Sequence, residues 1–112
     1  MEITKEKKGN FILLKINTEK LDSTLSPNLK AEFVMLNKEG ENKFLVDLSN
    51  VKYCDSSGLS AILVGNRLCN EIDGKFVLSS MQEMVQKLIE ISQLDKILYI
   101  AKSIEEAEEL MA

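Results

Sequence analysis

The sequence of 112 residues contains no histidine. Without an imidazole side chain, the protein cannot form a Ser-His-Asp or a Cys-His catalytic arrangement. Histidine is also the side chain that most often binds transition metals, so its absence leaves little from which to build a metal site. No other pairing of a nucleophile with a base is recognisable. We therefore expect a protein that is not an enzyme and that requires neither a metal nor another cofactor.

Cysteine is scarce as well, and the two that occur are Cys54 and Cys69. The N-terminal residues lack the apolar segment of a secretory signal peptide, which favours a cytoplasmic location. In a reducing cytoplasm both thiols are expected to be free, and Cys69 falls on the apolar face of a predicted helix. Two thiols alone are too few for a metal site.

The sequence also lacks clusters of basic residues and long apolar runs. It has 14 Lys and Arg against 18 Asp and Glu, which gives a formal net charge of −4. This balance argues against nucleic acid as the main partner and gives little support to binding an anionic membrane. No apolar run approaches the roughly 18 residues of a membrane-spanning helix. Because 45% of the residues are hydrophobic, we expect one core and a single domain over residues 1–112.

Short apolar runs alternate with segments of helical spacing along the sequence. The order of these segments is ββαβαβαβα, which predicts an α/β fold with a mixed, mostly parallel sheet of about five strands and four helices. The first two strands are expected to form a hairpin across Gly9-Asn10. Strands are predicted at residues 3–8, 11–16, 44–48, 75–78 and 97–100, and the second helix at about residues 57–70.

Serine residues mark three of the expected helix starts. The Ser26-Pro27 pair is typical of a capped first turn, in which the serine accepts a hydrogen bond and proline occupies the first helical position. The motif Ser-x-x-Glu occurs at positions 80–83 and 103–106. It matches the capping box, in which serine and glutamate each satisfy a backbone N–H of the first turn. We therefore expect the first, third and fourth helices to be capped by these serines.

The most informative stretch is Asp55-Ser56-Ser57-Gly58-Leu59, between a predicted strand and a predicted helix. Parallel sheets bind ligands and partners at the carboxyl ends of their strands, and the positive end of a helix dipole tolerates negative charge. The structural interpretation is a capped helix start, which Asp, Ser and Gly all suit. The functional interpretation is a regulatory phosphoserine, whose charge of about −1.5 to −2 would change the electrostatic interaction with a docking partner.

A second polar loop, residues 18–24, follows another predicted strand. By spacing alone, it is best explained as a polar connection to the helix that starts near Ser26. The alternative is that it lies beside the serine loop, because both loops follow strands of one sheet. In that case the carboxylate of Asp22 would orient a hydroxyl group or a cation of a partner.

The sequence V-K-Y-C-D-S-S-G-L at positions 51–59 resembles the strand-end motif of STAS domains, in particular of anti-sigma factor antagonists of the SpoIIAA type. The L-D pair at positions 21–22 is similar to the family's pair before its first helix, and positions 88–97 are similar to its late helix. The resemblance covers essentially the whole chain. Glu19 and Ser60 stand where the family often has glycine, and these differences bear on the partner rather than on the fold.

The resemblance implies a partner-switching protein. In that family, a serine kinase that is also the anti-sigma factor phosphorylates the second serine of the motif, which is Ser57 here. The unphosphorylated protein binds the kinase so that a sigma factor is released, and a PP2C-type phosphatase reverses the modification. Asp22, Asp55, Ser56 and Gly58 are then expected at the partner surface. We also expect a monomer or weak dimer.

A second interpretation is a STAS interaction module that is not controlled by phosphorylation, for example in a transporter or a signalling complex. In that case the serines only stabilise the helix start, and a Ser57→Asp variant should bind partners unchanged. The residues themselves leave both interpretations open.

Overall fold

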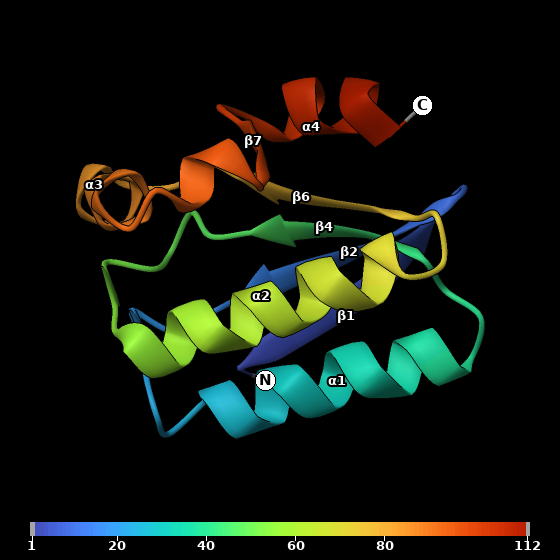
Figure 1. Cartoon of the computed structure of the whole chain (residues 1–112), viewed down its shortest axis with the longest axis horizontal. Coiled ribbons are helices and arrows are strands. Elements are labelled where there is room, and N and C mark those ends of the chain that lie inside the picture. Colours follow the sequence, from blue (N-terminus) through green and yellow to red (C-terminus); the bar gives the residue numbers. More distant parts are fainter. Residues whose placement is uncertain (1, 112) are drawn as a thin grey trace.

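A computed structural model describes residues 2–111 of the protein. Within these residues, five strands form one mixed sheet in the order β1-β2-β4-β6-β7, and four α-helices pack around it (Figure 1). The predicted α/β architecture is therefore confirmed. The strands of this sheet are β1 (Ile3–Lys8), β2 (Phe11–Ile16), β4 (Lys43–Asp47), β6 (Lys75–Ser79) and β7 (Tyr99–Ala101). The helices are α1 (Ser26–Lys38), α2 (Ser56–Asn70), α3 (Glu83–Ile91) and α4 (Ile104–Met111).

The hairpin of β1 and β2 forms as predicted. The two strands pair antiparallel, from Ile3 opposite Ile16 to Lys8 opposite Phe11. Gly9 has a φ of +58°, the left-handed conformation that this turn requires and that glycine adopts without strain. All other neighbours in the sheet pair in parallel, and the mostly exposed β1 forms one edge.

The helices cover the two faces of the sheet unequally. α1 and α2 lie against one face, and α4 lies against the other (Figure 1). In the larger core, the ring of Phe33 stacks on Phe44 at 5.6 Å between centroids and meets Phe76 edge-on at 5.5 Å. Gly65 of α2 permits this packing, because a Cβ atom there would lie 2.6 Å from the Phe76 ring. The smaller core under α4 is formed by Phe11, Leu45, Val77, Ala101, Ala107 and Met111.

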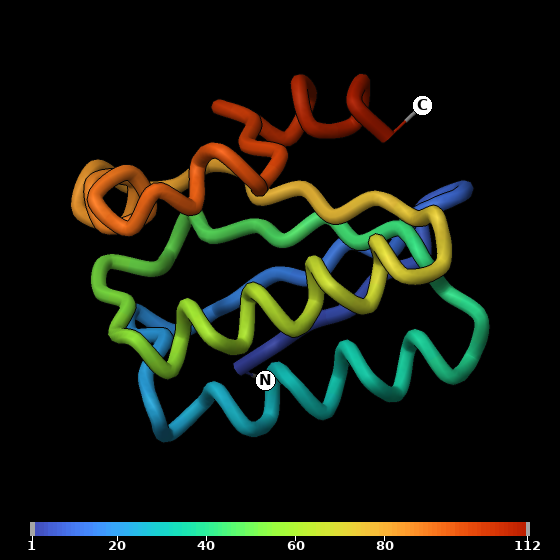
Figure 2. The backbone as a smooth tube through the Cα atoms, in the orientation of Figure 1, coloured from blue at the N-terminus to red at the C-terminus, as the bar shows by residue number. Residues whose placement is uncertain are grey.

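Two very short strands, β3 (Lys20–Leu21) and β5 (Tyr53–Cys54), form a separate parallel pair that the sequence did not predict. Two residues are too few to show alternation of apolar and polar side chains. The pair joins the loop after β2 to the loop after β4, and Figure 2 shows both loops at the end of the molecule where α2 begins. The loop of Asp22 thus lies beside the serine loop, which was the alternative to a simple polar connection.

The predicted caps of the first and third helices are wrong. α1 begins at Ser26, but no side chain caps it, and the buried Ser26 hydroxyl donates instead to the carbonyl oxygen of Asp22. α3 begins at Glu83, where the preceding Gln82 makes no cap hydrogen bond. Ser80 lies outside the helix with a φ of +62°. The Ser-x-x-Glu motif at positions 80–83 therefore does not form a capping box.

The serine cap of the fourth helix is confirmed. The backbone N–H of Glu106 donates to the hydroxyl of Ser103 over 3.2 Å, and the Glu106 carboxylate accepts from the N–H of Lys102 at 3.4 Å. The last strand is displaced from the predicted residues 97–100 to β7. The reason is the 3₁₀ helix η1 (Leu94–Lys96), which occupies the chain just before it.

Candidate functional site

The residue that caps α2 is Asp55, not one of the serines. Asp55 has extended backbone angles, and its Oδ1 atom accepts a hydrogen bond from the N–H of Gly58 at 3.0 Å. This is the usual N-cap geometry, which satisfies one of the free N–H groups of the first turn. The capping function is therefore already fulfilled without a serine hydroxyl. Ser56 begins the helix with an exposed side chain.

The hydroxyl of Ser57 is held between two oxygen atoms. It donates to Oδ1 of Asp55 at 2.6 Å, and its Oγ atom lies 3.1 Å from the Oγ atom of Ser26. The hydrogen bond from Ser57 lowers the pKa of Asp55 below its ordinary value, and the N–H of Gly58 adds to this effect. Asp55 is therefore a carboxylate at neutral pH, and Ser57 is the residue of the motif with a hydroxyl oriented by a negative charge.

Ser26 extends this network to the loop of Asp22. Its hydroxyl donates to the carbonyl oxygen of Asp22 at 2.7 Å, while Oδ1 of Asp22 accepts from the N–H of Thr24 at 3.0 Å. Carbonyl and carboxylate oxygens only accept, so two hydroxyl hydrogens serve three oxygen–oxygen contacts. A hydrogen bond between Ser26 and Ser57 therefore forms only when Ser26 no longer donates to Asp22 or Ser57 no longer donates to Asp55. The serine loop and the Asp22 loop are thus linked through α1.

Gly58 brings the two loops together in another way. A Cβ atom at this position would collide with the carbonyl oxygen of Leu21 and lie 2.7 Å from Sγ of Cys54. Only glycine therefore allows β3 to approach the first turn of α2 this closely. Gly58 is buried, so it shapes the site and offers no surface of its own.

The structure places every residue of the predicted site at this one end of the molecule. Ser57, Asp55 and Ser56 lie at the start of α2, and the Asp22 loop lies beside them. Ser26 is a further residue of the site, although the Ser26-Pro27 pattern predicts only a helix cap. A signal was present, because Ser26 precedes the buried Leu29 and Phe33 at helical spacing and so falls on the buried side of α1.

Cys54, the residue that precedes Asp55, is not activated as a nucleophile. Cys54 is buried beneath the loop, and burial, together with the negative charge of Asp55, raises the pKa of its thiol to about 12. The thiol is therefore protonated and a poor nucleophile. Among residues 2–111, no three His, Cys, Asp or Glu side chains are grouped so that they could hold a metal ion. No helix in the described part of the chain has the length and apolar character needed to cross a bilayer.

Comparisons with known proteins agree with this fold. A family model described as the STAS domain matches residues 2–107. The anti-sigma-B factor antagonist of Staphylococcus epidermidis is 27% identical over 96 residues, which cover 86% of this chain and 88% of that protein. The solved structure of TM1081 from Thermotoga maritima has a TM-score of 0.92 at 27% identity and covers 97% of this chain and 93% of its own.

A further solved structure, that of Bacillus SpoIIAA in its phosphorylated form, shares the fold. It has a TM-score of 0.77 at 17% identity, and the match covers 98% of this chain and 99% of that one. The match to the family model spans both the Asp22 loop and the serine motif and includes all strands of the sheet. The chain therefore belongs to the STAS domain family.

Proposed function

We propose that this protein is an anti-sigma factor antagonist whose binding to an anti-sigma factor kinase is switched by phosphate on Ser57. The names of similar proteins support the first part, since relatives over most of this chain are anti-sigma-B factor antagonists. The observation that carries the second part is the Ser57 hydroxyl, held 2.6 Å from the Asp55 carboxylate at the N-terminus of α2. SpoIIAA, which has the same fold, occurs in a phosphorylated form.

In the proposed reaction, the Oγ atom of Ser57 bonds to the γ-phosphorus of ATP bound by the kinase. The bond from that phosphorus to its bridging oxygen breaks, ADP leaves, and the hydroxyl proton passes to a base of the kinase. The antagonist contributes no ATP site or metal to this step. Its part is to present one oriented hydroxyl next to the docking residues Asp22, Asp55 and Ser56, on a loop shaped by Gly58.

The phosphate would change this surface in two ways. The esterified Oγ atom can no longer donate to Asp55, so the 2.6 Å hydrogen bond is lost. A group of charge about −1.5 to −2 then lies beside an existing carboxylate, although the N-terminus of α2 favours negative charge. A partner that complements the neutral serine would meet a like-charge contact. A 100-fold loss of affinity corresponds to about 2.7 kcal/mol, which one desolvated contact of this kind can supply.

The proposal is tested by incubating the protein with ATP and its cognate anti-sigma kinase, and by mapping the phosphate with mass spectrometry. We expect phosphate on Ser57, no phosphate on the Ser57→Ala variant, and normal phosphorylation of the matched control Ser56→Ala. Phosphorylation should weaken kinase binding about 100-fold. A PP2C-type phosphatase should restore binding. Phosphate on Ser56 alone, or equal binding before and after phosphorylation, would contradict the proposal.

One observation favours a second function, that of a STAS interaction module without a phosphate switch in a transporter or signalling complex. Ser57 is only partly exposed, and both Asp55 and Ser26 already contact its hydroxyl. A serine held in this way can be purely structural. The discriminating variant is Ser57→Asp, which adds a negative charge at the same position. Unchanged partner binding by this variant would support the module, whereas loss of binding would support the switch.

A further inference from the structure

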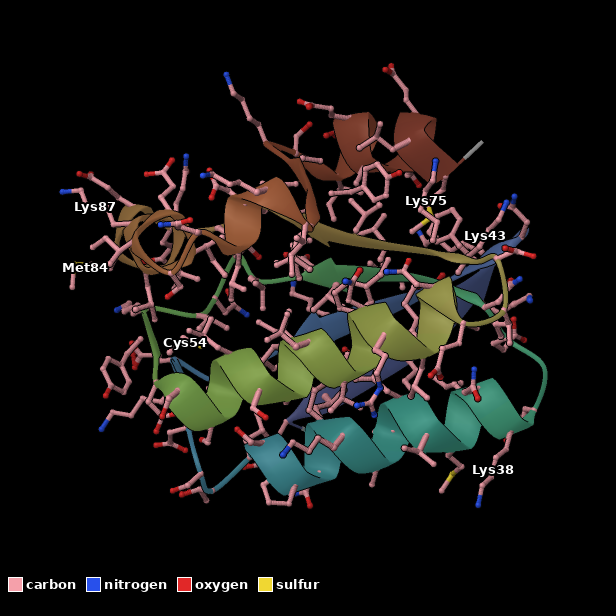
Figure 3. The ribbon with its side chains drawn as sticks, in the orientation of Figure 1. Lys38, Lys43, Cys54, Lys75, Met84 and Lys87 are labelled. Carbon is pink, nitrogen blue, oxygen red and sulfur yellow. The ribbon has the colours of Figure 1, made fainter. Side chains whose placement is uncertain are left out.

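A shallow apolar groove lies beside the serine site, between β5 and α3. Its volume is about 290 Å³. Figure 3 shows Met84 projecting from α3 at the end of the molecule where Cys54 precedes the start of α2. We propose that this groove binds an amphipathic helix of the partner, with apolar side chains in the groove and acidic side chains at its margins. The apolar lining is formed by Tyr53, Cys54, Met84, Leu88 and Ile91.

The exposure of these side chains indicates a protein partner. Met84 and Ile91 are 69% and 79% exposed, and Tyr53 is 51% exposed. Met84, Leu88 and Ile91 follow one another at i, i+4 and i+7, so they form a stripe along α3. Met84 and Ile91 are its exposed members, and Leu88 between them is partly buried and also packs against the core. The inner side of α3 is already buried in the core through Val85 and Ile89. α3 therefore has a second apolar stripe, and an open stripe of this spacing suits a helix better than an enclosed small molecule.

The charges at the groove specify the partner further. Lys52 and Lys87 line it, and no acidic residue does, although the protein as a whole has a net charge of −4. Each lysine makes an ion pair with a carboxylate that does not line the groove, Lys52 with Glu19 at 2.7 Å and Lys87 with Glu83 at 3.1 Å. All four side chains are well exposed, so these pairs contribute little stability, and each ammonium group keeps further N–H donors. Acidic residues of a partner can therefore bind both lysines.

The groove adjoins the surface on which a kinase would reach Ser57. Tyr53 and Cys54 line the groove, and they directly precede Asp55, the residue that holds the Ser57 hydroxyl. The identity of the partner as the anti-sigma kinase rests on the proposed function. The groove itself does not, since it follows from the exposed stripe and the two lysines. One partner can thus occupy the groove and place its ATP over Ser57.

The chemistry of the groove is tested directly with two synthetic helical peptides. Both carry leucine at i, i+3, i+4 and i+7, and they differ only in having glutamate or lysine at the flanking positions. We expect the acidic peptide to shift NMR signals of Met84, Lys87 and Tyr53 and to bind at least tenfold more tightly than the basic one. Equal binding of both peptides, no binding, or shifts confined to another surface would overturn the proposal.

The role of the groove in the proposed complex is tested with variants and the cognate kinase. Met84→Glu and the double variant Lys52→Glu/Lys87→Glu should each weaken kinase binding at least tenfold. The matched control is Ile72→Glu, since Ile72 is an exposed apolar residue just beyond the far end of α2. Wild-type binding by both groove variants would overturn the groove as the kinase site and leave the phosphate switch intact. No binding by the wild-type protein would contradict the proposed function, while the peptide measurement still decides the groove.

Discussion

Among single residues, the motif divides two roles, because Asp55 caps the helix and Ser57 carries a hydroxyl that the cap residue orients. Asp55 caps α2, and this leaves the Ser57 hydroxyl to contact Asp55 and Ser26. A capping serine and a phosphate-accepting serine would need similar positions, so the sequence alone could not distinguish them. The hydrogen bonds show that Asp55 is the cap and that the Ser57 hydroxyl donates to its carboxylate, and phosphate acceptance by Ser57 remains the proposal.

Removing the hydroxyl of Ser26 should loosen this arrangement. Ser26→Ala takes away the donor to the Asp22 carbonyl and the contact with Ser57, so we expect a loss of about 1 kcal/mol in the free energy of unfolding. Urea unfolding measures this loss. The control is Ser56→Ala, at the exposed position next to Ser57, which should change stability by less than about 0.5 kcal/mol. Equal effects of the two substitutions would show that the Ser26 network does not stabilise the loop.

The lowered pKa of Asp55 predicts how its contribution depends on pH. In the folded protein the pKa lies below its ordinary value of 3.8, so the carboxylate stabilises the folded state at pH values above 3.8. This contribution should disappear as the pH falls through the pKa of the folded protein. Asp55→Asn keeps an acceptor oxygen for Gly58 but has no charge to titrate. The difference in unfolding free energy between the two proteins should therefore be constant near neutral pH and shrink in acid, and a difference that grows in acid would refute this assignment.

At the scale of secondary structure, the site depends on elements too short to be predicted. β3 and β5 have two residues each, yet their parallel pairing places Asp22 beside the motif. The caps of α1 and α3 show a related limit. The hydroxyl of Ser26 donates to the Asp22 carbonyl oxygen instead of capping α1. Ser80 has a left-handed backbone conformation and lies before α3 without capping it. In both cases the tertiary surroundings outweigh a local preference that is correct on average.

A substitution at Gly58 tests how closely β3 approaches the first turn of α2. An alanine within a helix normally stabilises it relative to glycine by up to about 1 kcal/mol. At position 58 we expect the opposite sign, with a loss of about 1–3 kcal/mol, because the added Cβ would meet the Leu21 carbonyl and the Cys54 sulfur. Ser60→Ala, at an exposed position of the same helix, should be neutral or slightly stabilising. Thermal unfolding of the two variants checks the contrast, and a stabilised Gly58→Ala protein would contradict the tight contact.

At the scale of the whole molecule, one aromatic cluster connects the sheet to the two helices that form the site. Phe33 comes from α1, Phe44 from β4 and Phe76 from β6, and Gly65 of α2 leaves room for two of the rings. α1 carries Ser26 at its start, and α2 carries Ser57 at its start. The distance between the two hydroxyl groups is therefore set by how the two helices pack on the sheet.

Truncating the central ring should destabilise the whole protein. Phe33→Ala removes both ring contacts and leaves a cavity, so we expect a loss of about 3–5 kcal/mol. This is a large part of the roughly 5–15 kcal/mol that stabilise a typical domain. Val34→Ala, at the exposed neighbouring position, is the control and should cost well under 1 kcal/mol. Calorimetry of both variants decides the matter, and similar melting temperatures would argue against a single core linking sheet and helices.

The order of the four helices and of the five strands of the main sheet, the α/β architecture and the position of the serine motif follow from the sequence alone. These features depend on local patterns, since apolar spacing and turn residues are properties of neighbouring amino acids. The packing of the folded chain shows that Asp55 is the cap, that Ser26 contacts Ser57, and that α3 carries an apolar stripe beside the motif. The cap is local, but which side chain takes it depends on rotamers that the sequence pattern does not specify. The contact of Ser26 with Ser57 and the exposure of the stripe involve groups far apart in the chain. They exist only once the helices and loops have packed against the sheet.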